Sequence, residues 1–324
     1  MLRANELPED LVIQILLWLP VVSLLRFKSV CKSWYALITN QNFIAKHLLY
    51  NKNCNTQLLF KTRDKSNEDY VVSTISHETL QVSLTQPLPP YFELDVDEKF
   101  FIFVVGSCNG LVCLHDYLAL HEVIWNPATK ETKIVPKSNL PRIVPAGCYT
   151  RTEGTYINGM ASWAAYSNDW EESFLLSFDM SNEVFLKTPF PNTYSKRADK
   201  LFVLNELIAI NFPRIIDEQG FKVSYDIWSL LKVGIKESWT SLFTIGPFIQ
   251  INDSLGLPFP FPLGFWKNDA MFIVNEQLVL YDPSTKQMTS LQIHVDRESM
   301  QLVTYMETLV SVKNLKSRTI VDKA

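Results

Sequence analysis

Apolar residues near the N-terminus recur at the spacing of an amphipathic helix. Leu7, Leu11, Ile15 and Leu19 are four residues apart, so they would lie along one side of such a helix. Pro20 is expected to end it, because a proline inside a helix removes a backbone hydrogen bond. The pattern therefore predicts a short helix at the start of the chain.

Three further short helices are expected before residue 50, and Ser23 can cap the first of these. Their apolar residues are, in order, Leu24, Phe27 and Val30, then Trp34, Leu37 and Ile38, then Phe43, Ile44 and Leu48. A bundle this small can bury only part of its apolar surface internally. The excess indicates a protein partner.

From about residue 57 the pattern changes to short runs typical of β-strands, separated by Asn, Asp, Gly and Pro. The runs are QLLFKT, YVVSTI, FFIFVV, LVCLH, EVIWN, TKIVP, ESFLLSF, KLFVLN, LIAIN, MFIVN and LVLYD. Many short strands at close spacing predict an all-β domain, either a propeller or a sandwich. Residues 297–312 are ambiguous between helix and strand.

Two segments of the β region resemble each other. WNPATKET (125–132) and YDPSTKQM (281–288) share an aromatic residue, Asn or Asp, Pro, a small residue, Thr and Lys. We expect a hairpin turn in each, in which the Asn or Asp side chain bonds the downstream backbone and the Thr begins the next strand. SFDMSNEVF (177–185) and SYDIWSL (224–230) keep the aromatic–Asp pair and are expected to be similar turns. Repeated units of this kind favour the blades of a propeller.

The pentapeptide GSCNG (106–110) fits two structures. It matches the glycine–x–nucleophile–x–glycine elbow of hydrolases, and it contains Asn-Gly, a strong signal for a tight hairpin. An elbow requires a helix directly after the nucleophile, whereas LVCLHDY has the alternation of another strand. The hairpin is therefore favoured, with glycines giving backbone freedom and Cys108 packing inside. A hydrolase that uses Cys108, with His115 or His121 as base, is the enzymatic alternative.

Cys108, Cys113, His115 and His121 also suggest a zinc site. Their C-x4-C-x-H-x5-H spacing matches none of the usual zinc-binding spacings, so we expect no metal and no other cofactor. The acidic pairs lack a supporting context for catalysis. We expect no enzymatic activity in the chain itself.

Composition limits the functional classes further. The chain has 324 residues, is 47% hydrophobic and carries a net charge of −4, which gives no general bias toward nucleic acid. Its five cysteines are irregularly spaced, which favours a reducing compartment, so the cytoplasm or nucleus is expected. The apolar run at 11–25 is too short and too interrupted to span a membrane. Residues 1–50 have five basic and three acidic residues, a net of +2, against −6 for the remainder, which indicates two regions with different surfaces.

The N-terminal region resembles an F-box. The matching segments are LPEDL (7–11), Ile15-Leu16, Leu19-Pro20, Leu24, Phe27-Lys28 and VCKSW (30–34). The β region resembles the F-box-associated domain of plant F-box proteins, in GSCNGLVCL, WNPATKE, LLSFDMSNEVF, YDIWSLLKVGIKESWT, PLGFWKND and LVLYDPSTKQM. The last of these blocks, with SMQLVTYMETLVSV, is most similar to S-locus F-box proteins.

The resemblance implies an α+β multidomain protein, with an α-helical F-box at residues 1–50 and an all-β, propeller-like (kelch-like) domain at 51–324. It implies the substrate-receptor subunit of a Skp–cullin–F-box ubiquitin ligase. The F-box would dock on a Skp-type adaptor, and through it on a cullin, while the β domain captures a target protein, for S-locus members a style-expressed, secreted-type ribonuclease. The residues that would make or support the docking surface are Leu7, Pro8, Leu11, Ile15, Leu16, Leu19, Pro20, Leu24 and Trp34.

The sequence departs from this family in two places. Trp18 and Val22 stand where relatives usually carry Arg or Lys. After Pro141 a segment that relatives have is missing, so the β domain is expected to be shortened by roughly one blade. A decayed adaptor, which docks on the ligase but binds no target, is therefore the second alternative.

Overall fold

The chain forms two compact units. One comprises Met1–Phe60, Asp69–Lys137 and Val303–Ala324, and the other comprises Lys61–Glu68 and Ser138–Leu302. The computed structural model describes residues 7–64, 66, 69–76, 78–89, 102–116, 121–135, 148–167, 172–179, 181–182, 184–191, 200–217, 222–249, 260–266, 269–295 and 301–314.

The described part of the N-terminal region contains the four expected helices. They are α1 (Glu9–Leu17), α2 (Val21–Phe27), α3 (Lys32–Thr39) and α4 (Gln41–Cys54). The prediction that Ser23 caps the second helix is wrong, because α2 begins directly after Pro20 and Ser23 lies inside it. Asn40 instead caps α4, where its side chain accepts a hydrogen bond from Asn42 N at 2.8 Å. The four helices lie within residues 7–54, which we call the helical region.

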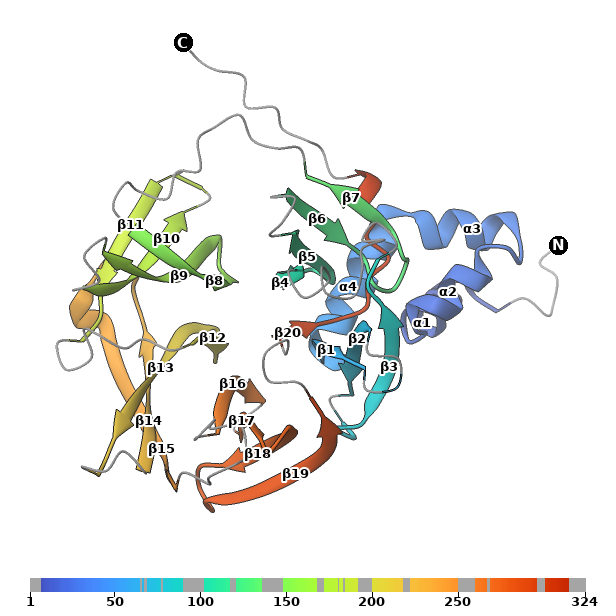
Figure 1. Ribbon diagram of the computed structural model, residues 1–324. Coiled ribbons are helices and arrows are strands. Elements are labelled where there is room, and N and C mark those ends of the chain that lie inside the picture. Colours follow the sequence, from blue (N-terminus) through green and yellow to red (C-terminus); the bar gives the residue numbers. More distant parts are fainter. Residues whose placement is uncertain are drawn as a thin grey trace, which may run out of the picture. The chain divides into compact units, whose positions relative to one another are not determined.

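The described residues of the β domain form five sheets of four strands each, as in the blades of a propeller (Figure 1). The first sheet has the order β20-β1-β2-β3, so a strand from the C-terminal end is hydrogen-bonded to the first strand after the helices. Its strands are β1 (Gln57–Arg63), β2 (Tyr70–Ile75), β3 (Val82–Pro87) and β20 (Gln301–Tyr305).

The other four sheets are antiparallel meanders, each built from four strands that are consecutive in the chain. The second sheet has β4 (Ile102–Cys108), β5 (Leu111–Asp116), β6 (His121–Trp125) and β7 (Thr132–Ile134). The third has β8 (Cys148–Ile157), β9 (Met160–Ser167), β10 (Ser173–Asp179) and β11 (Val184–Pro189). The fourth has β12 (Leu201–Leu204), β13 (Leu207–Ile215), β14 (Lys222–Leu230) and β15 (Trp239–Ile249). The fifth has β16 (Phe261–Trp266), β17 (Asp269–Val274), β18 (Gln277–Asp282) and β19 (Gln287–His294).

All eleven predicted runs overlap strands, and the propeller alternative is confirmed. The sheet β8–β11, which follows the expected gap after Pro141, has its full four strands. The predicted turn at 224–230 is wrong, because these residues lie within β14 and Asp226 is buried there. The ambiguous stretch 297–312 contains β20, and its end leads into a short 3-10 helix, Val312–Asn314.

Apolar side chains of the first two sheets share one core, which includes Leu59, Val72, Val104, Leu114 and Trp125. Burial of side chains of this size supplies roughly 1.5–3 kcal/mol each. The helical region has its own core, and that core includes one residue from the far end of the chain, Leu309. The C-terminal segment is therefore part of the packing of the helices.

A candidate docking surface and the strap behind it

The helical region presents a row of exposed apolar side chains, which we call the outer stripe: Leu7, Leu11, Ile15, Trp18 and Val22. Leu7 and Trp18 are 61% and 64% exposed, and the other three are also exposed. Successive members are three or four residues apart, so helical periodicity places Leu11, Ile15 and Trp18 along the same side of α1. An exposed row of large apolar residues marks an interaction surface more than a folding requirement.

The nine residues predicted for docking divide into two groups. Leu7, Pro8, Leu11, Ile15 and Pro20 are exposed, Leu19 and Trp34 are partly buried, and Leu16 and Leu24 are buried. The buried pair belongs to the core of the helical region, so it can support a docking surface but cannot contact a partner.

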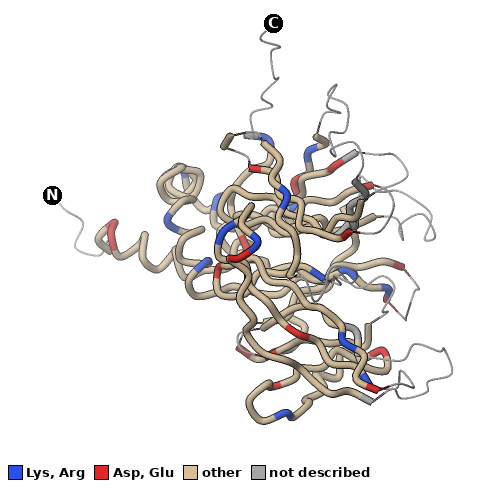
Figure 2. Tube along the Cα trace, turned by 90° about the vertical axis from the view of Figure 1, so that its left-hand side faces the viewer, with Lys and Arg blue, Asp and Glu red and all other residues tan. Residues whose placement is uncertain are grey.

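Charge around the stripe is uneven. Figure 2 shows acidic residues at the start of the helical region, next to the N-terminal trace, and these are Glu9 and Asp10 in the first turn of α1. They stabilise the helix there, because the N-terminal end of a helix dipole favours negative charge. The stripe itself contains no charged side chain.

Residues 306–312, which we call the strap, form hydrogen bonds with the helical region. The Glu307 carboxylate accepts a hydrogen bond from Val21 N at 2.9 Å, and its backbone carbonyl accepts one from Asn51 Nδ2 at 2.9 Å. Leu309 is 4% exposed and packs in the same cluster as Leu16. The strap thus contacts both the start of α2 and the end of α4.

The same strap bonds to the second sheet. Asn126, in the turn between β6 and β7, donates from Nδ2 to Thr308 O at 3.0 Å and to Val310 O at 2.8 Å. The Glu131 carboxylate accepts a hydrogen bond from Val312 N at 3.1 Å. The strap therefore holds the candidate docking surface against the sheets of its own compact unit.

His47, in α4, makes two hydrogen bonds next to the contact between the helical region and the strap. Its Nε2 lies 3.0 Å from Leu19 O, so this nitrogen carries the proton and donates it. Its Nδ1 lies 3.3 Å from Asn51 Nδ2, which donates to it. Burial lowers the pKa of His47, and this outweighs the bond to Leu19 O and the nearby Glu307, which raise it. The buried imidazole is therefore neutral.

The hairpin interpretation of GSCNG is confirmed. β4 and β5 pair directly across Asn109 and Gly110, which have φ values of 52° and 77°. The expectation that Gly106 supplies similar freedom is wrong, since its φ is not positive and it lies at a register shift between β4 and β5. A side chain on Gly110 would also overlap the strap at Met306 O and the Thr308 side chain.

The cysteine chemistry is not supported by the geometry. Cys108 is exposed rather than packed inside, and partial desolvation raises the pKa of its thiol, which keeps it protonated. Burial raises the pKa of Cys113 to about 11. His115 Nδ1 lies 3.4 Å from the Glu122 carboxylate. The side chain of His121 lies outside the described residues. No cluster able to hold a metal ion occurs among the residues the structure describes.

The role of the strap could not be found from the sequence. The block SMQLVTYMETLVSV supports the family resemblance, but nothing in its pattern identifies Leu309 as part of the helical core. Among the residues that the structure describes, no helix is long and apolar enough to cross a membrane.

Comparison with known proteins agrees with this architecture. Residues 5–46 match the F-box domain family. Probable F-box protein At1g14315 of Arabidopsis thaliana is 26% identical to the chain, over 94% of this chain and 99% of the relative. Putative F-box protein At3g10240 is 26% identical over 86% and 83%, and F-box/kelch-repeat protein At3g23880 is 26% identical over 76% and 81%, both from the same plant. The N-terminal helices are therefore an F-box domain, and the chain as a whole is similar to plant F-box proteins.

Proposed function

We propose that the chain is the substrate-receptor subunit of a Skp–cullin–F-box ubiquitin ligase, located in the cytoplasm or nucleus. The observation that carries this proposal is the outer stripe, a row of exposed apolar residues on an F-box domain. Leu7, Leu11 and Ile15 contact the Skp-type adaptor, and the cullin is reached through that adaptor. Leu16 and Leu24 hold the helices beneath the stripe in place.

The chain carries out no chemistry itself. The raised pKa of the Cys108 thiol and its place beside a hairpin turn, with no helix following, support a binding role over a hydrolase. The β domain captures the target. The similarity of the C-terminal blocks to S-locus proteins favours a secreted-type ribonuclease as that target.

Docking is tested with an exposed pair of substitutions, Leu11→Asp together with Ile15→Asp. Binding of the purified full chain to a plant Skp-type adaptor is measured by calorimetry. We expect a loss of at least about 30-fold, because each charge replaces a buried contact at the centre of the interface. The control is Leu231→Asp, an exposed leucine in the other compact unit, which should bind as the unchanged chain does.

Undiminished adaptor binding by the double variant would overturn the docking proposal. Leu16→Asp is a poorer test, because Leu16 is buried and its replacement would unfold the helices. Target capture is tested by incubating the immobilised chain with style extract. Recovery of a ribonuclease supports the finer proposal. Recovery of none, alongside a longer relative that recovers one, overturns it and leaves an adaptor that docks without this target.

A further inference from the structure

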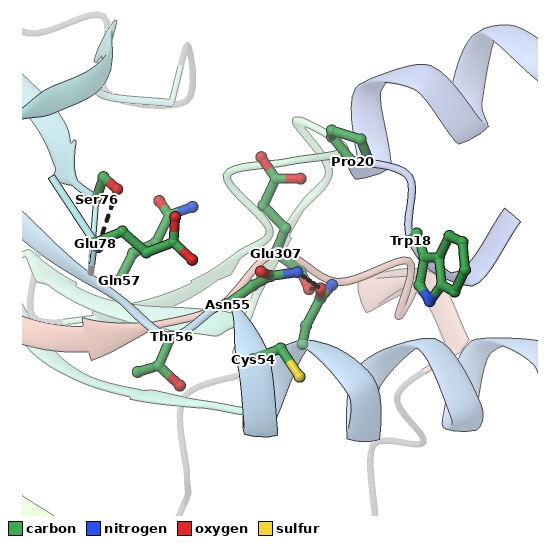
Figure 3. Close-up of a pocket in the computed structure, with 10 residues that line it drawn as sticks. Trp18, Pro20, Cys54, Asn55, Thr56, Gln57, Ser76, Glu78 and Glu307 are labelled. Carbon is green, nitrogen blue, oxygen red and sulfur yellow. Dashed lines mark hydrogen bonds between the residues drawn. The ribbon is translucent and has the colours of Figure 1, made fainter. Parts of the chain in front are cut away.

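A pocket of about 310 Å³ lies within the first compact unit (Figure 3), and Cys108, Cys113 and His115 are not among its described lining residues. Four segments line it: the connection from α1 to α2, the end of α4 with the residues that follow it, the turn between β2 and β3, and the strap. Trp18 is the one member of the outer stripe that also lines this pocket.

The lining of the pocket is acidic. Its described lining residues include two carboxylates, Glu78 and Glu307, and no Lys, Arg or His. One oxygen of Glu307 accepts the hydrogen bond from Val21 N. Within the described residues the Glu78 carboxylate has no hydrogen bond and no ion pair, and its backbone N–H alone bonds to Ser76 Oγ at 3.3 Å. The pocket thus presents carboxylate oxygens that a ligand with several donors can reach.

The other end of the pocket is apolar. In Figure 3, Trp18 and Pro20 lie on the helical side, Glu307 lies between the two sides, and Glu78 lies on the strand side. Trp18 is 64% exposed, so much of its indole ring is free to contact a ligand. A ligand that matches this lining has an apolar stem for Trp18 and Pro20 and a cationic head for the glutamates.

We propose that this pocket binds an arginine side chain from a segment of a partner protein. The guanidinium group is planar, presents five donors and pairs with carboxylates. Its three-carbon stem lies along apolar surface while the charged end reaches the acceptors. The pocket adjoins the outer stripe through Trp18, but the contacts proposed for the adaptor rest on Leu7, Leu11 and Ile15, and none of these lines the pocket.

The test uses the full chain and two blocked tripeptides, acetyl-Gly-Arg-Gly-amide and the same peptide with citrulline in place of arginine. Citrulline keeps the shape of arginine but removes its charge. Binding is measured by ligand-observed NMR titration. We expect the arginine peptide to bind about tenfold more tightly than the citrulline peptide. The Glu78→Gln variant should lose most of that difference. It should fold normally, because Glu78 is exposed.

The matched control is Glu206→Gln, an exposed glutamate in a hairpin turn of the other compact unit, which should keep the full difference. Equal binding of the two peptides to the unchanged chain would overturn the proposal. So would an equal loss in Glu78→Gln and Glu206→Gln, because the peptide would then be responding to overall charge. Glu78→Gln should bind the Skp-type adaptor normally, so failure here leaves the docking proposal standing.

Discussion

The two turns with related sequences, 125–132 and 281–288, have the same local structure. In each, the backbone N–H of the lysine bonds the carbonyl oxygen four residues before it, at 2.9 Å for Lys130 to Asn126 and 2.8 Å for Lys286 to Asp282. Both lysines have positive φ, 63° and 59°. The Asn126 and Asp282 side chains each accept hydrogen bonds from the backbone N–H groups two and three residues later. The shared sequence therefore encodes a shared turn.

The surroundings of the two turns differ. Asn126 is fully buried and uses its amide hydrogens to bind two carbonyls of the strap. Asp282 lies near the surface, where hydrogen bonds from Ser284 and Thr285 lower the pKa of its carboxyl to about 2. Asparagine can both accept and donate, whereas an ionised aspartate can only accept. Asparagine therefore occupies the buried turn that binds the strap, and aspartate occupies the turn near the surface.

Exchanging Asn126 and Asp282 should separate the part each side chain plays within its turn from the binding of the strap. Asn126→Asp should have the largest effect. It removes both donors, leaves two strap carbonyls unpaired and places a negative charge beside them in a buried site. We expect a loss of about 3–5 kcal/mol in the free energy of unfolding. The measurement is urea unfolding followed by circular dichroism.

The reverse exchange, Asp282→Asn, is the matched control. An amide oxygen can still accept the two backbone hydrogen bonds of the turn, so the change should stay within the range of ordinary surface substitutions. If the two variants lost similar stability, the strap bonds of Asn126 would contribute little and the contrast between the turns would fail.

Two Asn-Gly hairpins offer the same contrast with a smaller expected effect. Gly110 and Gly159 have nearly equal φ values, 77° and 79°. A side chain on Gly110 would come within 2.6 Å of the Thr308 side chain, whereas the nearest atom to one on Gly159 is Ser181 Oγ at 3.9 Å. Gly159→Ala should cost about 1–2 kcal/mol from backbone strain alone. Gly110→Ala adds the overlap with the strap and should cost about 3 kcal/mol in total.

Thermal unfolding of the two glycine variants measures this difference. Equal losses would mean that the strap moves aside easily at Met306 and Thr308. A larger loss in Gly110→Ala would show that the strap is fixed against the β4–β5 hairpin. The pentapeptide that resembled a nucleophile elbow would then have a structural role.

The elements that could be predicted from the sequence are those set by local pattern. The four helices and eleven of the strands follow from periodicity and turn residues. Strands such as β14 and β19 were missed, because β14 contains a Tyr-Asp pair typical of turns and β19 has few apolar residues. Asp226 can lie inside β14 because Thr244 Oγ1 donates to its carboxylate and Arg214 Nε lies 3.3 Å away. These partners are distant in sequence, so no local pattern reveals them.

Only part of the candidate docking surface could be predicted, because the rest also depends on residues that are distant in sequence. Four-residue spacing identified Leu11 and Ile15, but it could not separate them from the buried Leu16 and Leu24. That separation depends on which side of α1 packs against α4, and on Leu309, which comes from the other end of the chain. Trp18 departs from the family pattern, yet its place in a pocket depends on Glu78 and Glu307, which are far from it in sequence.

The smallest expected effect concerns pH, at the helical side of the strap. The neutral His47 ring donates from Nε2 to Leu19 O and accepts at Nδ1 from Asn51, so a second proton on Nδ1 would face another donor. Because the pKa of His47 is lowered in the folded chain, the unfolded chain binds this proton more readily. Stability from this group is complete above the ordinary histidine pKa of about 6.5. It falls as the pH drops from there toward the lowered pKa, by at most about 1.4 kcal/mol per pH unit, and is constant below that lowered pKa. Urea unfolding between pH 7.5 and 5 should show this slope in the unchanged chain and a flatter one in His47→Gln, whose amide can still donate to Leu19 O. The control is His294→Gln, at an exposed position, which should keep the full slope. If the His47→Gln curve ran parallel to that of the unchanged chain, protonation of His47 would not weaken the contact between the F-box and the strap.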